Sequence, residues 1–408
     1  MTRTRYGVSP WIDEFPKRRR PDFPRFRGDA SYPVVIVGGG LAGVMTAYAF
    51  SAAGVRVALF EADRLGLAGG GRSTGLLHGE AAPSFRDIEA RHGRKAARAM
   101  FDASRRAVLD LAAAARRLGV KAIETHDALR VLGSHTADEK SLARDVAARR
   151  DAGLDAVWLK PAAATRETGL EIGRAAVRFH DWGQADPYRL LTAFAAAAVD
   201  RGAALFERSP VRRVKVGRRN VEAQVDGGRI TAGTIIVCTG EPTELYASLR
   251  RHVDFQERYA VLTERVPPVV RKQIPAAVRI VTDTESPPHE VRVLGDGRLL
   301  VAGAEQPRPS SRAPDKVVVQ RTGQLMYELL RLYPAISGLQ PQFGWAAPVA
   351  TTADRAMYAG PHRNFPRHLF AWATRHDPAQ AFLASRILLR HYLEQPDRTD
   401  AYFGFTRG

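Results

Sequence analysis

The sequence has a single cysteine, few lysines and no long apolar run, and each of these absences excludes a class of protein. One cysteine, Cys238, cannot form an internal disulfide or a cysteine-based zinc site, and it fits a reducing compartment. No apolar stretch approaches the ~18 residues that span a bilayer, and no apolar core of a secretory signal follows the charged N-terminus. We therefore expect a cytoplasmic protein without a membrane span.

The formal net charge of +18 suggests nucleic acid as a partner, but the distribution of the charge argues against it. Only eight of the 61 basic residues are lysines, and the arginines are spread along the whole chain. No helix-turn-helix, zinc-finger or RNA-binding motif accompanies the charge. We expect a basic, solvated surface and no nucleic-acid partner. The sequence also contains no metal-binding constellation and no Gly-x-Ser-x-Gly nucleophile motif.

The first ordered segment predicts a strand, a helix and a second strand. Residues 34–37 form a short apolar run, a helix is expected over 41–53, and Gly54 ends it before a strand over 55–60. This order is typical of a right-handed parallel crossover. Residues 1–31 are rich in proline and arginine without periodicity, so they predict an extended arm.

A glycine motif lies between that strand and helix. Gly38 permits a tight turn, Gly40 lets the backbone approach a diphosphate, and Gly43 permits close packing of helix on strand. The N–H groups at the helix start, around Leu41 and Ala42, would face the phosphates. Glu61 ends the second strand, 18 positions after Gly43, where a carboxylate binds ribose hydroxyls and repels a 2′-phosphate. The motif predicts a site for the ADP half of a dinucleotide other than NADP.

A second glycine-rich segment over 66–75 favours FAD over NAD. It follows the second strand directly and can supply N–H and hydroxyl donors to a large extended cofactor. The candidate cofactor residues that this segment and the strand end contribute are Ala62, Arg72, Ser73 and Thr74.

Capping residues and turn signals predict the later elements. Helices are expected after Ser84, after Thr136 with Glu139, after Asp186-Pro187 and after Asp377, and another over about 314–332. Short strands crowd the regions 203–238 and 259–302, with Asp226-Gly227 and Asp296-Gly297 as hairpin turns.

At these residues the chain resembles the D-amino-acid-oxidase (DAO) class of FAD-dependent oxidoreductases, relatives of sarcosine, glycine and glutamylputrescine oxidases. The resemblance runs from about residue 32 to 393. It rests on the run VVIVGGGLAG from Val34, on Ala185-Asp186-Pro187-Tyr188, on the strand at Val211, on the run ending in Thr239-Gly240, and on Asp296-Gly297-Arg298 with the strand after it. The resemblance implies that Val211, Thr239 and Gly240 contact FAD.

The resemblance implies an α/β (mixed α+β) fold, in which a Rossmann-like FAD-binding domain carries an inserted antiparallel β-rich substrate domain. We expect an arm over 1–31, a discontinuous FAD-binding domain, a substrate domain and a short C-terminal tail. The FAD-binding domain would comprise 32–86, 181–250 and 342–395, the substrate domain 87–180 and 251–341, and the tail 396–408.

The family also implies an activity, in which hydride transfer to FAD oxidises a C–N bond of an amino acid or amine. The position of His78 does not match the histidine-linked relatives, so FAD is expected to be non-covalent. Two other interpretations stay open: a catalytically degraded FAD-binding protein or partner subunit, and an FAD hydroxylase or dehydrogenase with an acceptor other than oxygen. The sequence leaves the oligomeric state open.

The chain departs from the family pattern at two places. The glycine-rich segment that holds the pyrimidine end of the flavin is replaced here by the residues 371–378, and Asp-Gly-x-Pro is replaced by Asp354-Arg355-Ala356-Met357. The bulkier residues predict either a narrower flavin site or lost catalysis. The helix after Pro378 and the side chain of Arg375 are expected to favour negative charge on the flavin.

Four residues are candidates for catalysis or substrate binding, each with a purely structural alternative. His289 would act as a base or orienting group and Arg292 as a clamp for a carboxylate, on opposite faces of one strand. Tyr259 lies where the family often has an aromatic residue near the substrate. His376 precedes the last helix and would lie over the flavin.

Overall fold

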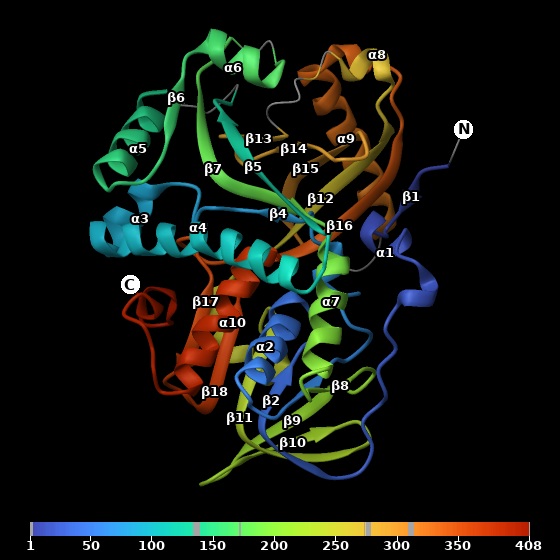
Figure 1. The fold of residues 1–408 in the computed structure, drawn as a ribbon, viewed down its shortest axis with the longest axis vertical. Coiled ribbons are helices and arrows are strands. Elements are labelled where there is room, and N and C mark those ends of the chain that lie inside the picture. Colours follow the sequence, from blue (N-terminus) through green and yellow to red (C-terminus); the bar gives the residue numbers. More distant parts are fainter. Residues whose placement is uncertain are drawn as a thin grey trace.

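The structure is a computed structural model that describes residues 3–133, 139–170, 173–272, 274, 279–308 and 314–407. Two mixed sheets lie one above the other along the long axis of the molecule, and the helix α4 (Arg94–Arg117) runs between them (Figure 1). This arrangement confirms the expected α/β fold class. Among the described residues, no helix is both long enough and apolar enough to cross a bilayer.

The smaller sheet is the nucleotide-binding type of sheet that the glycine motif predicts. Its core strands are parallel in the order β18, β11, β2, β3, β8, while β17 and the β9–β10 ribbon pair antiparallel. The strands are β2 (Ala30–Val37), β3 (Val57–Phe60), β8 (Ala204–Phe206), β9 (Val211–Val216), β10 (Val221–Val225), β11 (Gly228–Gly240), β17 (Tyr358–His362) and β18 (Phe365–Trp372).

Both faces of this sheet are covered, which explains the continuous apolar run in β2. Val34 and Ile36 face a core formed with α2 (Leu41–Ala52), α7 (Pro187–Val199) and α10 (Pro378–Tyr392). Val35 and Val37 face the opposite core, which the β10–β11 hairpin and Phe26 of the N-terminal arm complete. A strand buried on both faces has no polar alternation to show in its sequence.

The larger sheet has the order β1, β16, β12, β15, β14, β13, β5, β7, β4, with β6 paired to β7. The expectation of an antiparallel sheet is correct for most pairs, but β13 pairs with β5 and β1 pairs with β16 in parallel. The strands are β1 (Arg5–Tyr6), β4 (Leu76–Leu77), β5 (Ile123–Val131), β6 (Val157–Leu159), β7 (Ala176–Ala185), β12 (Asp254–Arg265), β13 (Ile280–Asp283), β14 (Glu290–Val293), β15 (Arg298–Pro307) and β16 (Pro341–Thr351).

The remaining helices surround the larger sheet and the N-terminal arm. They are α1 (Pro10–Asp13), α3 (Phe85–His92), α5 (Glu139–Asp151), α6 (Pro161–Thr168), α8 (Pro268–Arg271) and α9 (Pro314–Leu332), with the short 3-10 helices η1 (Lys17–Arg19), η2 (Gly70–Arg72), η3 (Glu244–His252), η4 (Pro334–Ile336) and η5 (Asp400–Phe403). The single helical stretch expected after Ser84 is broken at Gly93, whose φ of 81° does not continue a helix.

The helix caps agree with the sequence prediction where the structure describes them. The side chains of Ser84, Asp186 and Asp377 accept backbone N–H groups at the starts of α3, α7 and α10. Both predicted Asp-Gly turns connect paired strands. Thr136 lies outside the described residues.

Sheet membership suggests domain boundaries that differ from the expected ones. β7 pairs throughout with strands of the larger sheet before Asp186 starts α7, and β16 pairs with β12 of the larger sheet as far as Thr351. We therefore propose that the chain passes between the two domains near residues 186 and 352, because hydrogen-bonded strands of one sheet form a common core.

The N-terminal arm lies on the body of the protein. β1 adds to the larger sheet, the fully buried Ser9 donates from Oγ to the carbonyl of Gly71 at 2.5 Å, and Trp11 donates from Nε1 to the carbonyl of Ser73 at 2.9 Å. The arm therefore supports the second glycine-rich segment from behind.

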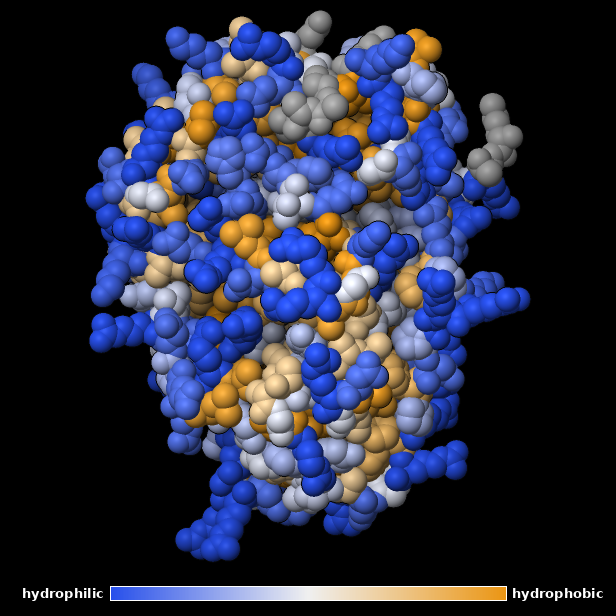
Figure 2. All heavy atoms as spheres, in the orientation of Figure 1, coloured by the Kyte–Doolittle hydropathy of each residue, from blue (hydrophilic) through white to orange (hydrophobic). Residues whose placement is uncertain are grey.

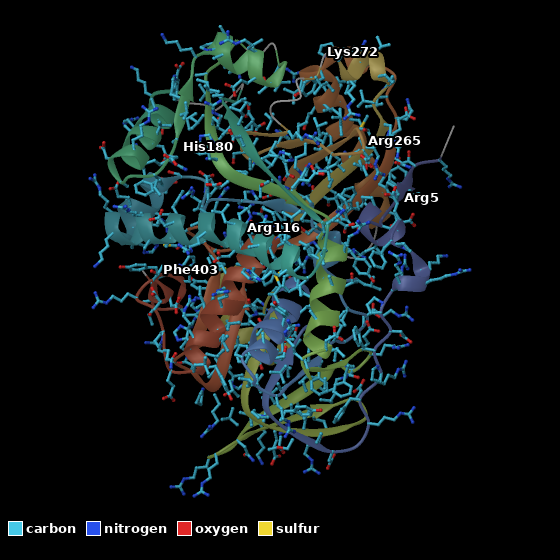
Figure 3. All side chains as sticks on the ribbon, in the orientation of Figure 1. Arg5, Arg116, His180, Arg265, Lys272 and Phe403 are labelled. Atoms are coloured by element: carbon cyan, nitrogen blue, oxygen red, sulfur yellow. The ribbon has the colours of Figure 1, made fainter. Side chains whose placement is uncertain are left out.

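The C-terminal segment also packs on the core, beside α10. Phe403 of η5 is 1% exposed and joins the helix-side core of the smaller sheet (Figure 3). Asp400 accepts a hydrogen bond of 2.8 Å from Nε of Arg390, on α10. Hydrophilic side chains cover most of the face in Figure 2, with apolar atoms showing mainly toward its middle.

Candidate functional site

The glycine turn between β2 and α2 is as tight as its sequence predicts. Gly38 has a φ of 106°, and a Cβ atom there would lie 2.6 Å from the carbonyl oxygen of Cys238 in β11. A Cβ atom on Gly43 would clash with the carbonyl oxygen of Gly38. At Gly40, in contrast, no heavy atom lies within 4 Å of where a Cβ would stand. The first and third glycines therefore close the turn, while the second opens onto free space.

The N-terminus of α2 faces this space without a cap of its own. Gly40 is the N-cap residue, and no side chain accepts a hydrogen bond there. The N–H groups of the first helical turn, from Leu41 to Gly43, have no acceptor within the helix and carry the positive end of its dipole. Such a site suits the phosphates of a dinucleotide.

Glu61 lies directly beside the turn. Its Oε2 accepts the N–H of Gly39 at 2.6 Å and its Oε1 accepts the N–H of Asp63 at 2.9 Å. Each carboxylate oxygen keeps a second lone pair, so both remain able to accept ribose hydroxyls. Ala62 is exposed beside it, and Val211 is partly exposed at the start of β9. The turn, the uncapped helix and this carboxylate together fit the ADP half of FAD.

The second glycine-rich segment is held by residues from both sheets. Ser73 donates from Oγ to the carbonyl of His376 at 2.6 Å, and Trp345 donates to the carbonyl of Arg72 at 2.9 Å. Arg292 donates from Nη2 to the carbonyl of Thr74. The segment is therefore rigidly placed between the glycine turn and the interior of the molecule.

The turn after β11 completes the cofactor-facing elements. Gly240 has a φ of 79°, and Thr239 donates from Oγ1 to the carbonyl of Glu241 at 2.6 Å. A Cβ atom at Gly240 would contact the ring of His376, so this turn, too, approaches the last loop of the chain.

That last loop has an unusual backbone. Ala373, Arg375 and His376 all have φ values between 52° and 57°, in the left-handed region. Non-glycine residues there cost roughly 1–2 kcal/mol each, and clusters of them occur at functional sites. These are the positions at which the family resemblance leads us to expect glycines.

His376 packs inside this loop. Its Nε2 lies 2.6 Å from the carbonyl oxygen of Pro348, and its ring packs so closely on Gly69 that no Cβ could be added there. Burial lowers the pKa of His376, so the ring is neutral and donates from Nε2. The structure therefore gives His376 a packing role between two glycine-rich segments.

The N-terminus of α10 is closed by its own carboxylate. Asp377 is 3% exposed and accepts the N–H of Ala379 at 2.8 Å. It also accepts the N–H of His78 at 3.0 Å and lies 3.1 Å from Nδ1 of the same histidine. Asp377 therefore satisfies one N–H group of this helix and places a carboxylate at its start, while the expected effect of the helix on the flavin stays a prediction.

A cavity that opens to solvent lies between the two sheets, next to this loop. Its wall combines residues of the larger sheet and its loops with residues of the last loop and α10, among them His78, Arg130, His289, Arg355, Arg375 and Gln380. A smaller cavity of about 400 Å³ continues it toward Ser73, Thr74 and His376. The second glycine-rich segment and the space between the sheets therefore face each other.

Charged side chains of neighbouring strands pair beneath the cavity. Arg258 of β12 lies 3.1 Å from Glu290 and 2.8 Å from Glu305. Arg292, fully buried, lies with Nε 2.7 Å from Glu290, an ion pair without hydrogen-bond geometry. With Thr74 as its other partner, Arg292 is a link between β14 and the second glycine-rich segment and does not line either cavity. The clamp role expected for it has no support here.

His289 borders the cavity but is not free to act as a base. It lies just before β14, with Nδ1 2.8 Å from Asp283 and Nε2 2.9 Å from Glu328. The hydrogen bonds to these two carboxylates raise the pKa of His289 to about 10. The imidazole is therefore charged at neutral pH and holds both protons.

Tyr259 lies away from the cavity. It is 1% exposed in the core of the larger sheet, donates to Glu257 at 3.0 Å and accepts from Gln306 at 2.9 Å. Burial, followed by the charge of Glu257, raises the pKa of Tyr259 to about 12. These contacts describe a structural tyrosine.

Sequence reasoning missed three residues that line the site. Arg258 precedes the apolar run Tyr259–Leu262 of β12, and Glu290 begins β14, whose sequence EVRV alternates charged and apolar residues. A charged residue in a buried strand signals that the strand faces a polar interior. Asp377 was recognised as a helix cap, but its contact with His78 joins residues 299 positions apart and leaves no local trace.

Comparisons with known proteins agree with this site. The family described as FAD dependent oxidoreductase (DAO) matches residues 33–384, which is most of the chain. No curated protein matches it. Among solved structures, glycine oxidase from Geobacillus kaustophilus has a TM-score of 0.76 at 18% identity, covering 93% of this chain and 99% of that chain.

Two further solved structures have similar folds. L-Amino acid deaminase from Proteus myxofaciens has a TM-score of 0.76 at 16% identity and covers 95% of this chain and 96% of its own. L-Proline dehydrogenase from P. horikoshii has a TM-score of 0.73 at 19% identity and covers 92% of this chain and 96% of its own. The expected fold and family resemblance are confirmed.

Proposed function

The chain belongs to the family of FAD-dependent oxidoreductases, and we propose that it oxidises a C–N bond of an amino acid or amine. The observation that carries this proposal is the cavity between the two sheets, which ends at the second glycine-rich segment and the last loop. Its place beside the cofactor-facing elements suits a small substrate. The neighbours named above are an oxidase, a deaminase and a dehydrogenase of amino acids.

We assign the two ends of the cofactor site to different parts of the chain. Gly38, Gly40, Gly43 and Glu61 would hold the ADP half, and the segment from Arg72 to Thr74, with Thr239 and Gly240, would lie along the middle. The last loop, from Ala373 to Asp377, would hold the flavin end. This assignment is supported by the contacts of Ser73 and Gly240 with His376, which join the three segments.

Bound FAD would supply the hydride acceptor for oxidation of a substrate C–N bond to an imine, with the proton of the nitrogen released to solvent. The protein's own contribution is positioning. His289 already holds both ring protons, and the ring of His376 is fixed between Pro348 and Gly69, so we assign neither a proton-transfer role. The remaining polar side chains of the cavity wall bind and orient the substrate, and the buried core around them limits the access of water.

The experiment is an anaerobic titration of the purified, FAD-loaded protein with a panel of amino acids and amines. Loss of the oxidised flavin band with at least one of them is expected. If none of them reduces the flavin while dithionite does, the proposed reaction is wrong. Admission of air afterwards separates an oxidase, which recovers its colour, from a dehydrogenase that needs another acceptor.

A variant tests the cofactor assignment separately. Glu61→Ala removes the carboxylate beside the glycine turn, and we expect FAD to bind at least 10-fold more weakly because two hydrogen bonds to a charged group are lost. Flavin content after gel filtration measures the effect. Unchanged flavin occupancy would contradict the ribose role of Glu61.

A further inference from the structure

Arg355 occupies a backbone conformation that favours glycine. It lies in the loop between β16 and β17, at the second position of Asp354-Arg355-Ala356-Met357, where the family pattern has glycine. Its φ of 61° is in the left-handed region, which side chains with a Cβ rarely adopt. Because the backbone conformation is unfavourable for arginine, we infer that the side chain of Arg355 has a role.

The neighbouring aspartate forces this conformation. Asp354 accepts from Oγ1 of Thr352 at 2.8 Å and from the N–H of Ala356 at 3.1 Å, which closes the loop on itself. Nε of Arg407 lies 2.9 Å from the carboxylate and Nε2 of His92 lies 3.1 Å from it. The loop is anchored to the C-terminal segment and to α3, so the backbone at Arg355 is held whatever residue stands there.

The side chain of Arg355 stands where two cavities meet. It lines the central cavity and also an outer cavity of about 1270 Å³. The two cavities share further wall residues, among them Pro83, Arg130 and Asp283. A substrate that enters through the outer cavity therefore passes the guanidinium group of Arg355.

Two arginines that line the cavity lack a close carboxylate partner of their own. Among the described residues, Arg355 forms no ion pair, and its side chain is exposed. The closest carboxylate to Arg375 is Glu305 at 3.6 Å, and Glu305 already binds Arg258 at 2.8 Å. Burial lowers the pKa of Arg375; the charge of Glu305 opposes this effect, and the positive charges of Arg258 and Arg355 add to it.

The uncharged polar groups of the wall also include hydrogen-bond donors without acceptors. Trp182 and Gln380 are both more than nine-tenths buried and border the cavity, yet Nε1 of Trp182 and Nε2 of Gln380 have no acceptor within the part of the chain that the structure describes. Nε of Arg258 is likewise without one. The carboxylates of the wall, in contrast, are already paired, Asp377 with His78 and Asp283 with His289. The central cavity therefore has spare hydrogen-bond donors, whereas the outer cavity also carries carboxylates, among them Asp87 and Asp145.

We propose that the substrate is an amino acid with a second carboxylate, one carboxylate binding Arg375 and the other binding Arg355 at the mouth of the cavity. This proposal rests on the proposed function, whose substrate class it narrows. Guanidinium groups bind carboxylates through two parallel hydrogen bonds, and such pairs discriminate strongly against ligands that lack the charge. Arg355 is then a specificity-determining residue that this chain has in place of a glycine.

The test measures binding of two acids that cannot be oxidised at a C–N bond. Glutarate carries two carboxylates and butyrate carries one on a chain of similar length. Each is titrated into the FAD-loaded protein, with tryptophan fluorescence and the visible flavin spectrum as readouts. We expect glutarate to bind at least about 10-fold more tightly than butyrate, and Arg355→Gly to remove most of this difference.

Arg355→Gly restores the residue that the backbone favours, so it is expected to fold with an unchanged or higher Tm. Arg213→Gln is the matched control, because it removes one exposed positive charge on β9, outside both cavities. The control should retain the preference for glutarate. Equal affinities of the wild type for the two acids, or an equal loss of both in Arg355→Gly, would overturn the proposal.

These outcomes are separate from the test of the proposed function. If no amino acid reduces the flavin but glutarate binds through Arg355, the anion site stands and the reaction does not. If neutral amino acids reduce the flavin as well as acidic ones do, and Arg355→Gly leaves their relative kcat/KM unchanged, the reaction stands and the substrate class is wrong.

Discussion

The helices α2 and α10 both start beside the cofactor site, but their N-termini differ in one residue that decides what each can bind. At α2 the N-cap is Gly40, with no capping side chain and free space in front of it. At α10 the N-cap is Asp377, whose buried carboxylate accepts the helix N–H of Ala379. The dipole has the same sign in both helices. The first helix offers its N–H groups to an external anion, whereas the second supplies the anion itself.

The difference shows that a helix N-terminus is an anion site only when the chain leaves it uncapped. A capping carboxylate satisfies the N–H groups and also puts a negative charge where a ligand's negative charge would otherwise lie. The ADP end of the cofactor site is therefore prepared for phosphate. The flavin end, which we assign to the last loop, already carries a negative charge, with His78 as its partner.

The largest effect is expected when α2 receives an acidic N-cap like that of α10. In Gly40→Asp the backbone needs no change, because the φ of −78° suits any residue. The new carboxylate would accept the first N–H groups and repel the diphosphate. We expect FAD affinity to fall by 100-fold or more, measured by fluorescence titration of the apoprotein, while the Tm of the apoprotein rises slightly.

The control is Gly40→Ala, which adds a methyl group in free space and no charge. It should retain FAD far better than Gly40→Asp. Equal loss in the two variants would mean that space at this position matters and charge does not.

A smaller effect is expected when the negative charge of the N-cap of α10 is removed. Asp377→Asn retains an acceptor for the helix N–H but removes the negative charge beside the proposed flavin end. Loss of that charge favours added electrons, so the reduction potential of bound FAD should rise by about 30 mV, equivalent to ~1.4 kcal/mol for two electrons. Potentiometric titration against a reference dye measures it.

Asp186→Asn is the matched control, because Asp186 caps α7 in the same way but does not border the central cavity. It should leave the potential unchanged. A shift of the same size in both variants would show that the effect comes from net charge and that Asp377 does not act locally.

The last prediction concerns pH and leaves the bound cofactor unchanged. The pKa of His289 is raised from 6.5 to about 10 by Asp283 and Glu328, from β13 and α9. Its stabilising charge is therefore fully present below pH 6.5 and is lost as the pH rises through 10. His289→Gln should be less stable than the wild type near neutral pH, and the gap in Tm should narrow between pH 7 and 10.

We expect a substitution beside the cavity to change the dependence of Tm on pH, and a substitution at the ADP end to leave it unchanged. Glu61→Gln, at the ADP end, should leave the slope of Tm against pH between 7 and 10 as it is in the wild type. A constant gap between wild type and His289→Gln over that range would contradict the ionised pairing.

Local sequence signals were sufficient for the ADP end. Gly43 and Glu61 act through neighbours in one βαβ unit, so their spacing alone predicts their contacts, and the same holds for the caps at Ser84 and Asp186. The contact of Gly38 with Cys238 of β11 lies outside that unit. The cavity end was harder to predict. Tyr259 and Arg292 were expected near the substrate, but the first lies in the sheet core and the second binds Thr74. Strand alternation shows on which face of the sheet a side chain lies, but not which residues it contacts there.

The sequence by itself determined the glycine turn and the uncapped start of α2, because these depend mainly on residues within one crossover, and it determined the family from motifs spread along the chain. Only the tertiary structure decided the rest: that Asp377 meets His78, that His289 is held between two carboxylates, and that Arg355 stands at the mouth of the cavity. The physical reason is that charge and burial depend on partners from different elements, such as Asp283 of β13 and Glu328 of α9 for His289, or His78 for Asp377, which come together only when both sheets are formed.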